Sequence, residues 1–577
     1  NDEKVTHFHS TMLGLSSAQF DGHSCISLGN EDTDLLENCC LVHIADKSVV
    51  ETEKPLVLED DRLYLNRYWR YEKRLVVNVL SRLANNSKPQ TLDAPILLDK
   101  YFPLINTSEV DWQREAAKSS IEQAFTIITG GPGTGKTSTV LKILALLQEL
   151  SNAELRISLA APTGKAAMRL QQSLLEGKQE LRLQNQALLD SIPETVSTLH
   201  RLLGPINQSN HFLHHSDNPL TCDLLVVDES SMIDLAMMSK LLDALQPNAR
   251  IILLGDKDQL ASVESGSVLN DLCLGLPQQT VELKKTWRFS GPIKSLAHAI
   301  NTGDADEAWC LLNGQARKNE DLVSETTSNK KTSKKPQEHY QYSLFDELEV
   351  AAPIVKGTPS VIDPHGAEIQ LANEHWLEQI YKQYQPYVEE VCQINGPEAA
   401  LNAFAKFQVL AAIRKGPLGV EGINLALEKR LYSNQMQTHL PWYHGKPVMI
   451  TRNDPALGLF NGDIGICLHK EGQSQFRVWF RESNGKFRAV LPARLPQHET
   501  VYAMTIHKSQ GSEFEKVMIV LPENPSPILS KELLYTGVTR AKEQVTVVSG
   551  EDVLKYTVSQ KVSRNSGIQS KIESARV

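Results

Sequence analysis

A glycine-rich loop suited to binding phosphate groups is the clearest chemical signal in the sequence. Residues 130–137 follow the pattern Gly-x-x-x-x-Gly-Lys-Thr, between an apolar run at 125–129 and a helical pattern at 138–150. Glycines let backbone N–H groups surround phosphates, the lysine supplies a positive charge, and the threonine hydroxyl is a ligand for Mg²⁺. The sequence therefore predicts a nucleoside triphosphate site with Mg²⁺, formed by Gly130, Gly131, Pro132, Gly133, Thr134, Gly135, Lys136, Thr137 and Ser138.

Three further polar residues follow apolar runs, as hydrolysis of the nucleotide requires. Asp228 and Glu229 come directly after the run at 224–227, and Gln259 follows the run at 250–254. Asp228 is suited to hold Mg²⁺ and Glu229 to orient and deprotonate water, while Gln259 can contact both the γ-phosphate and that water. A capped strand end is the alternative interpretation of the acidic pair. Together with the phosphate loop, these residues predict a catalytic site for hydrolysis.

The elements that position these motifs belong to the α/β class. Short apolar runs that alternate with helical patterns are typical of a parallel sheet covered by helices. The first such runs lie at 125–129, 156–160, 224–227 and 250–254. They predict that the motifs lie together at the carboxyl edge of one sheet.

Two other regions have a different pattern. Apolar runs joined by turn signals at 447–451, 464–469, 476–480 and 487–491 predict a small β-barrel, inserted into a second α/β domain that resumes near residue 500. Residues 1–106 have helical patterns, one extended piece and no chemical motif, so we expect a helical N-terminal domain. Its tyrosine, tryptophan and arginine residues suit a protein interface, with a packed helical domain as the alternative.

The motifs occur in the order typical of superfamily 1 helicases, and the chain resembles that superfamily over nearly its whole length. Residues 61–69 and 450–465 resemble its RecD branch. The resemblance rests on Gln113, residues 130–137, 161–165, 198–201, Asp228 and Glu229, residues 255–260, 287–289, 505–511 and 535–541. It implies two RecA-like parallel-sheet motor domains, an SH3-like inserted barrel, and ATP with Mg²⁺ as cofactors.

The resemblance also implies roles for individual residues. Gln113 would contact adenine, Gln510 and Gly511 would belong to the nucleotide site, and Arg288 and Arg540 would act as arginine fingers from the two sides of a cleft. The implied contacts to DNA phosphates are Thr163, Lys165 and His200 in the first motor domain and Thr505 and His507 in the second.

The expected domains follow from these boundaries. Residues 1–106 form the N-terminal domain, 107–300 the first motor domain, 301–433 and 500–577 the second motor domain, and 434–499 the inserted barrel. Residues 317–357 are polar and lysine-rich, which is typical of a flexible insertion. Within this insertion, Gln341-Tyr342-Ser343-Leu344-Phe345 resembles the peptide with which bacterial proteins dock on the replication sliding clamp, and a chance apolar patch is the alternative.

Bulk composition sets limits on the location and on the DNA contact. The net charge of −10 and the pI near 6.0 do not favour a broad basic face, so contact with DNA is expected in a confined groove. The sequence has no apolar stretch of the ~20 residues that a membrane helix needs, and we expect a cytoplasmic protein. The eight cysteines are scattered, which argues against a zinc or disulfide framework.

Three functions from different classes are consistent with these patterns. The favoured one is a 5′ to 3′ single-stranded-DNA motor that acts on duplex ends, as a subunit with RecB-like and RecC-like partners in the repair of double-strand breaks and the degradation of linear DNA. A stand-alone RecD-like helicase is the nearest alternative, although such members typically carry a longer N-terminal extension. An ATP-dependent switch or assembly protein is the second alternative. A nuclease is disfavoured, because the sequence has no convincing acidic cluster outside the ATP site.

Overall fold

A computed structural model describes most of the chain. The described residues are 2–45, 52–84, 93–104, 110–151, 154–181, 186–206, 209–262, 264–285, 291–314, 361–362, 368–372, 375–393, 396–432, 441–454, 456–469, 475–482 and 485–576. Arg288 and the whole 317–357 insertion, with its segment from Gln341 to Phe345, lie outside these ranges. No helix in the described part of the chain is long and apolar enough to cross a membrane.

The N-terminal region is mixed α/β, which corrects the expectation of a helical domain. Helices α1 (Asp2–Phe20) and α2 (Asn30–Glu37) accompany a four-stranded sheet of order β1-β4-β3-β2. Its strands are β1 (Cys25–Ser27), β2 (Val42–Ile44), β3 (Leu56–Glu59) and β4 (Arg62–Leu65). β3 and β4 form a hairpin that turns at Asp60, whose φ of 54° is a left-handed conformation that aspartate tolerates. The extended piece in the sequence is this hairpin.

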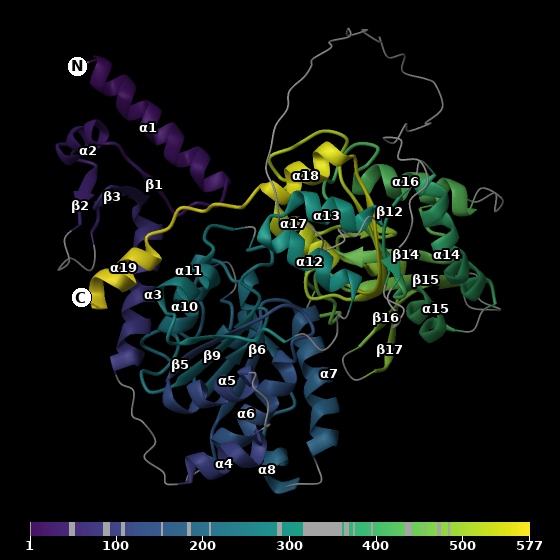
Figure 1. Ribbon diagram of the computed structural model, residues 1–577, viewed down its shortest axis with the longest axis horizontal. Coiled ribbons are helices and arrows are strands. Elements are labelled where there is room, and N and C mark those ends of the chain that lie inside the picture. Colours follow the sequence, from purple (N-terminus) through teal and green to yellow (C-terminus); the bar gives the residue numbers. More distant parts are fainter. Residues whose placement is uncertain are drawn as a thin grey trace, which may run out of the picture.

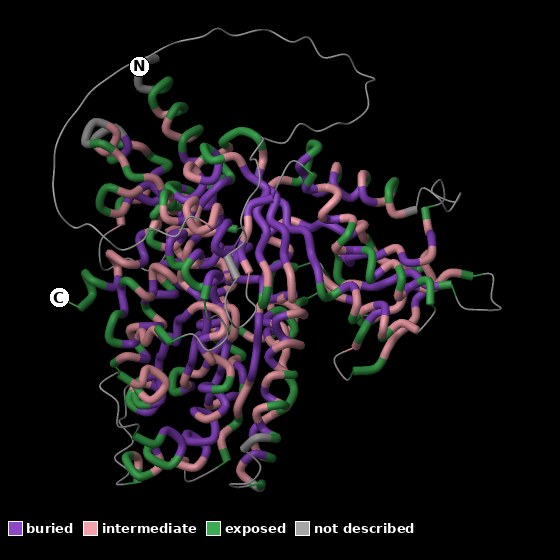
Figure 2. The backbone as a smooth tube through the Cα atoms, turned by 45° about the vertical axis from the view of Figure 1, so that its right-hand side comes forward, coloured by how far each residue is buried: buried purple, intermediate pink, exposed green. Residues whose placement is uncertain are grey.

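The first motor domain is built on a six-stranded parallel sheet of order β10-β5-β9-β8-β6-β7. Its strands are β5 (Phe125–Thr129), β6 (Ile157–Ala161), β7 (Ser197–Thr198), β8 (Leu224–Val227), β9 (Arg250–Gly255) and β10 (Thr280–Glu282). The four predicted strands are confirmed within one residue. β5 and β8 are buried along their whole length, because helices cover both faces of the sheet (Figure 2).

Each face of this sheet has its own apolar core. One face packs against α4 (Ala94–Tyr101), α5 (Trp112–Glu122), α6 (Lys136–Leu150), α7 (Gly164–Leu181) and α8 (Gln186–Ser191). The other packs against α3 (Asn66–Ala84), α9 (Leu199–Leu203), α10 (Leu235–Asp243), α11 (Val268–Gly275) and the C-terminal helix α19 (Ile568–Arg576). The two ends of the chain therefore contribute helices to the core of the first motor domain.

The second motor domain has a six-stranded sheet of order β11-β12-β21-β20-β13-β19. Its strands are β11 (Val361–Ile362), β12 (Glu368–Leu371), β13 (Phe407–Ala411), β19 (Ala503–Thr505), β20 (Phe514–Val520) and β21 (Ala541–Val548), all parallel to their neighbours except β11. The helices around it are α12 (Pro292–Thr302), α13 (Ala305–Leu312), α14 (Trp376–Cys392), α15 (Pro397–Phe404), α16 (Val420–Tyr432), α17 (Lys531–Val538) and α18 (Glu551–Ser559). Two RecA-like motor domains, as the sequence predicts, lie side by side (Figure 1).

An antiparallel sheet of five strands is inserted between β13 and β19. Its order is β17-β16-β15-β14-β18, with β14 (Lys446–Ile450), β15 (Ile464–His469), β16 (Phe476–Arg481), β17 (Phe487–Val490) and β18 (His498–Thr500). The four predicted strands are present, and β18 is an additional edge strand. A small core that includes Val448, Cys467 and Val478 holds it together.

Two segments pack differently from the boundaries that the sequence predicts. Residues of α12, which begins at Pro292, belong to the core of the second motor domain, so that core begins before residue 301. After α18 the chain leaves the second motor domain and runs back to α3 and α11, where α19 packs (Figure 1). Its residues Ile568 and Ile572 are fully buried there. The last part of 500–577 therefore joins the first motor domain rather than the second.

Candidate ATP and DNA sites

The phosphate loop connects β5 to α6 in the manner that the sequence predicts. Gly133 and Gly135 have φ angles of 75° and 81°, a left-handed conformation that strongly favours glycine. The Lys136 ammonium donates hydrogen bonds to the carbonyl oxygens of Gly130 at 2.6 Å and Gly131 at 3.1 Å. The lysine therefore lies over the loop, where a triphosphate would meet its charge and the N-terminus of α6.

A cavity of about 280 Å³ brings residues from both motor domains together at this loop. Predicted residues that line it are Pro132, Gly133, Gly135, Lys136, Thr137, Ser138, Asp228, Glu229, Gln259 and Arg540. All but Arg540 come from the first motor domain, and Arg540 lies between α17 and β21 of the second. Because residues more than 400 positions apart in the sequence face one cavity, nucleotide binding and the relative position of the two domains are physically linked.

The acidic pair after β8 is held in an unusual environment. Burial and the nearby Glu229 charge raise the pKa of Asp228 to about 6, although the Lys136 charge partly offsets both effects. Glu229 has φ 51° and ψ 41°, one of two non-glycine residues with positive φ among those described. Such a conformation costs on the order of 1–3 kcal/mol and is concentrated at functional sites. Glu229 is among the residues that line the cavity.

A chain of hydrogen bonds connects the two motor domains behind the cavity. The Arg540 guanidinium donates to Gln259 Oε1 at 2.6 Å, and Gln259 Nε2 donates to Asp256 Oδ2 at 3.0 Å. The Tyr535 hydroxyl of the second domain donates to the same oxygen of Asp256 at 3.1 Å. Burial raises the pKa of Asp256 to about 6, with Lys136 opposing the shift. Arg540 itself is only 2% exposed and also donates to the carbonyl of Thr536.

Arg169 is a cavity residue that the sequence analysis missed. It lies on α7, lines the cavity, and forms an ion pair with Glu513 of the second motor domain. Arg169 stands one helical turn after Lys165, but this spacing alone does not distinguish it from an arginine on a solvent-exposed helix face. Only the approach of the second domain gives this arginine a partner and places it beside the phosphate site.

Several predicted nucleotide contacts lie elsewhere. Gln113 is the second residue of α5, where its backbone N–H donates to Asp111, and it is not among the residues that line the cavity. The Gln510 side chain is buried and donates to the Leu260 carbonyl at 2.9 Å, while Gly511 lies against Ala166 of α7. Gln510 and Gly511 therefore join the two domains behind the Gln259 loop instead of lining the nucleotide cavity, because the amide of Gln510 already has a partner there.

The predicted DNA contacts occupy different environments. Thr163 and Thr505 accept hydrogen bonds from the backbone N–H groups of Ala166 and Lys508, which leaves each hydroxyl proton available for a phosphate oxygen. His200 is exposed on one side and packs its ring edge-on against Phe212, with ring centroids 5.8 Å apart.

Lys165 is covered by the inserted sheet. Its Nζ is buried and has no hydrogen-bond partner among the described residues, and the backbone at Gly462 lies directly over its side chain. Burial lowers the pKa of Lys165 to about 8, with Asp463 of the insert opposing the shift. A phosphate can reach this ammonium only if the 458–463 loop moves away. The structure therefore separates Lys165 from the other predicted DNA contacts.

His507 lines a second cavity on the opposite side of Gln259 from the nucleotide site. Burial lowers the pKa of His507, and the nearby Arg564 charge lowers it further. The imidazole is therefore favoured in its neutral form.

Comparison with known proteins agrees with this geometry. Residues 113–265 match a family model described as an AAA domain, and residues 500–548 match a UvrD-like helicase C-terminal domain. The RecBCD enzyme subunit RecD of Haemophilus influenzae is 37% identical over 560 residues, which cover 93% of this chain and 84% of that protein. The chain belongs to the RecD family. It is an ATP-dependent DNA helicase.

Two other proteins have lower sequence identity to this chain. The ATP-dependent RecD2 DNA helicase of Deinococcus radiodurans is 29% identical, and the match covers 89% of this chain but 59% of that protein. The crystal structure of Pif1 helicase from Bacteroides in complex with ADP-AlF3 and single-stranded DNA is 16% identical, with a TM-score of 0.38, and covers 82% of this chain and 97% of that chain. The RecBCD subunit is therefore more identical to this chain than RecD2 is, and a larger share of its own length is matched.

Proposed function

We propose that this chain is the motor subunit of a RecBCD-type helicase and nuclease, and that it moves 5′ to 3′ on single-stranded DNA at duplex ends. The observation that carries the proposal is the hydrogen bond between Gln259 and Arg540 at the rim of the nucleotide cavity. A γ-phosphate in the cavity would compete for both groups, so each cycle of binding and hydrolysis changes the contact between the two motor domains. Such a coupling is what a translocating motor requires.

The roles of individual residues follow from their positions in the cavity. Thr137 and Asp228 present the oxygen ligands that Mg²⁺ prefers and would hold the ion, which would supply positive charge to offset the charge that develops on the phosphates. Lys136 would bind the β- and γ-phosphates, Glu229 would accept the proton of the attacking water, and Arg540 would stabilise charge on the γ-phosphate. Arg288 is proposed as a second arginine finger.

The proposed domains support this assignment. The N-terminal sheet with α1 and α2 is a candidate surface for the RecB-like and RecC-like partners, since several of its apolar side chains are exposed, among them Leu13 at 72% and Phe20 at 91%. The five-stranded insert is proposed to be an SH3-like barrel of the second motor domain. Docking of residues 341–345 on a sliding clamp remains a prediction, which a pull-down with Leu344→Ala and Phe345→Ala tests.

Two alternatives make different predictions. A stand-alone helicase is disfavoured because the RecBCD subunit of Haemophilus influenzae is more identical to this chain than RecD2 is, and a larger share of its own length is matched. An ATP-dependent switch would hydrolyse ATP at the same rate with and without DNA.

The test is the ATPase rate of the purified chain with and without a single-stranded oligonucleotide, alone and with the RecB-like and RecC-like chains of its source. We expect stimulation by DNA and co-purification of the three chains. Lys136→Gln should abolish hydrolysis while the thermal unfolding midpoint stays unchanged. DNA-independent hydrolysis would support the switch, and a fully processive lone enzyme would support the stand-alone helicase.

A further inference from the structure

The cavity that contains His507 lies between the two motor domains and the C-terminal segment. It has a volume of about 150 Å³ and is lined by the 257–261 loop, the start of α11, the start of α17 and residues 561–564. Gln259 lines both this cavity and the nucleotide cavity. A ligand on this side would therefore contact the loop whose glutamine faces the nucleotide.

The charge of the lining favours an anion. Four permanently or readily charged cations line the cavity, against the two carboxylates of Asp258 and Glu532. The cations are Lys257, Lys531, Lys561 and Arg564. Lys257 is paired with Glu282 at 3.0 Å, and Glu532 accepts a hydrogen bond from the backbone of Val562. With Lys257 neutralised by Glu282, the three cations Lys531, Lys561 and Arg564 exceed the two carboxylates by one charge, so the lining of the cavity is net positive.

Two buried polar atoms on the lining residues have no hydrogen-bond partner among the described residues. They are the hydroxyl oxygen of Ser231, a side chain only 7% exposed, and Nε of Arg564. An unmet buried donor costs about 1–3 kcal/mol. The same Arg564 guanidinium is oriented by hydrogen bonds from Nη1 to the carbonyls of Glu264 at 2.9 Å and Gly266 at 3.0 Å. The arginine is therefore held in place before any ligand arrives.

We propose that this cavity binds a phosphate group, which would accept hydrogen bonds from Ser231, Arg564 and Lys561. The inference extends the proposed function, because the backbone of single-stranded DNA is one source of that phosphate. Inorganic phosphate released by hydrolysis is the other source. In either case the bound group lies against the Gln259 loop, whose Leu260 is hydrogen-bonded to Thr536 and Gln510 of the second motor domain. Binding of a phosphate in the cavity would therefore shift the loop and change the hydrogen bond between Gln259 and Arg540.

Lys561→Ala and Ser231→Ala in the full chain test the site, with Lys516→Ala as the matched control. Lys516 lies in β20, paired in register with Phe407 of β13, and it is not among the residues that line either cavity. The first arm measures the oligonucleotide concentration that gives half-maximal ATPase stimulation, over a range of salt concentrations. A DNA phosphate in the cavity predicts a roughly five- to tenfold increase for Lys561→Ala and a salt slope smaller by about one. Ser231→Ala should raise the same concentration severalfold without changing the slope.

The second arm measures inhibition of the ATPase by inorganic phosphate in the absence of DNA, with chloride at equal ionic strength as the reference. Weaker inhibition in both variants, with unchanged DNA stimulation, identifies free phosphate as the ligand. Wild-type behaviour of both variants in both arms, with unchanged thermal unfolding midpoints, overturns the proposal. If the wild-type ATPase itself ignores DNA, the proposed function fails, and the phosphate arm still decides the cavity.

Discussion

At the scale of single residues, the nucleotide site combines strain, burial and charge. Glu229 is held in a left-handed conformation, and Asp228 and Asp256 are buried carboxyls whose pKa values are both raised to about 6. Residues that are costly to the fold in this way are common at catalytic sites, where the cost is offset by contacts elsewhere. We therefore expect these residues to lower the free energy of unfolding while they serve activity.

Arg540→Ala separates nucleotide binding from hydrolysis. The arginine faces the cavity from the second motor domain, so its charge acts when the cleft is closed on the transition state. We expect the Kd for ATP to stay within a fewfold of wild type and kcat to fall by a factor on the order of 10³. Equilibrium nucleotide titration and steady-state ATPase assays measure the two quantities. Equal losses in binding and rate would argue against the finger role.

Asp256→Asn is predicted to stabilise the protein while weakening the hydrogen-bond chain that connects the two motor domains. The folded protein binds the Asp256 proton more tightly than the unfolded chain, where the pKa is near 3.8, so ionisation destabilises the fold as pH rises from about 4 to about 6. The asparagine removes this cost. We expect the free energy of unfolding to rise by on the order of 1 kcal/mol at pH 8 and by less at pH 5. Chemical denaturation at the two pH values measures it, and an equal gain at both would show that ionisation is not the cause.

At the scale of elements, α7 contacts the nucleotide cavity, the inserted sheet and the second motor domain. Its first turn lies under the 458–463 loop of the inserted sheet and also contacts Gly511 of the second motor domain. One turn further along, Arg169 lines the nucleotide cavity and is paired with Glu513. A displacement of the inserted sheet or of the second motor domain therefore changes contacts of this one helix.

The ion pair between Arg169 and Glu513 is predicted to compete with the nucleotide. Glu513→Gln leaves the Arg169 charge free for a phosphate, so the Kd for ATP should fall severalfold. Arg169→Gln should raise it severalfold, and the double variant should resemble Arg169→Gln. Fluorescence titration with a labelled ATP analogue measures all three. If Glu513→Gln instead weakens binding, the carboxylate assists the arginine rather than competing with the phosphates.

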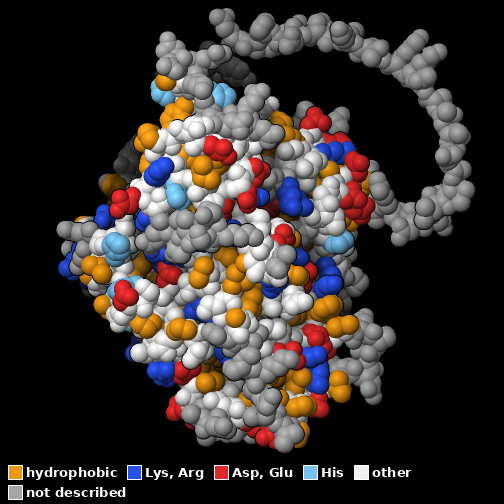
Figure 3. Space-filling model, turned by 90° about the vertical axis from the view of Figure 1, so that its left-hand side faces the viewer, with side chains coloured by type: hydrophobic (Ala, Val, Ile, Leu, Met, Phe, Trp, Pro, Cys, Tyr) orange, Lys and Arg blue, Asp and Glu red, His pale blue; other side chains and the backbone are white. Residues whose placement is uncertain are grey.

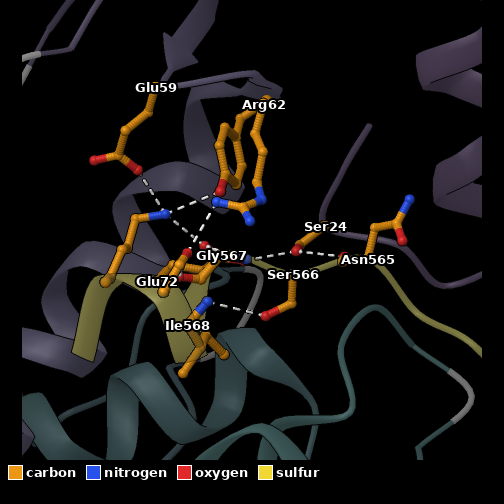
Figure 4. A network of polar contacts seen from close by, with 11 residues as sticks. Ser24, Glu59, Arg62, Glu72, Asn565, Ser566, Gly567 and Ile568 are labelled. Atoms are coloured by element: carbon orange, nitrogen blue, oxygen red, sulfur yellow. Dashed lines mark hydrogen bonds and ion pairs between the residues drawn. The ribbon is translucent and has the colours of Figure 1, made fainter. Parts of the chain in front are cut away.

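At the scale of the whole molecule, the N-terminal and C-terminal parts of the chain pack against each other. The C-terminal helix α19 leaves the second motor domain and packs on α3, where Lys571 Nζ lies 2.7 Å from Glu72 Oε2 and 2.6 Å from Glu59 Oε2 (Figure 4). Glu72 is fully buried and also accepts a hydrogen bond from Ser24 at 2.6 Å. Burial lowers the pKa of Lys571, but the two carboxylates outweigh it and raise the pKa overall. This network ties the N-terminal sheet, the first motor domain and the C-terminus together.

Lys571→Met is predicted to unfold this junction. It leaves the buried Glu72 carboxylate without its cation, a change that typically costs about 3–5 kcal/mol. The matched control is Lys555→Met, whose ammonium also contacts two carboxylates, those of Asp306 and Glu551, but at the surface. We expect a clear drop in the thermal unfolding midpoint for Lys571→Met and little change for Lys555→Met. Equal midpoints would show that the network does not contribute to stability.

One face of the molecule is consistent with the bulk charge. On that face, shown in Figure 3, basic and acidic side chains of the described residues are interspersed rather than gathered into a broad basic patch, which a net charge of −10 does not favour. The cationic groups that we assign to phosphate binding lie instead in cavities between domains. A confined contact with DNA, expected from the charge, is consistent with this distribution.

The sequence by itself determined the parts whose geometry is local. A phosphate loop, a strand-end acidic pair and the alternation of apolar runs with helical patterns each specify their own backbone, so four strands of the first sheet, the loop and four strands of the insert could be predicted closely. The second motor domain was predicted only as an α/β domain, without its strands. An extended piece was predicted around Asp60, but its pairing into a hairpin was not, because a short strand pair within helical patterns gives a weak periodic signal.

Only the tertiary structure decided which distant residues meet. Arg169 pairs with Glu513, Tyr535 donates a hydrogen bond to Asp256, and α19 packs against α3. Each contact buries apolar surface or charge from remote segments, and no local sequence pattern encodes which segments will meet. Packing between remote segments also explains why Gln510 and Gly511 lie at the domain interface instead of lining the nucleotide cavity. It likewise explains why Lys165 lies beneath the inserted sheet. Contacts between domains are set by packing over the whole chain, whereas motifs are set by a few adjacent residues.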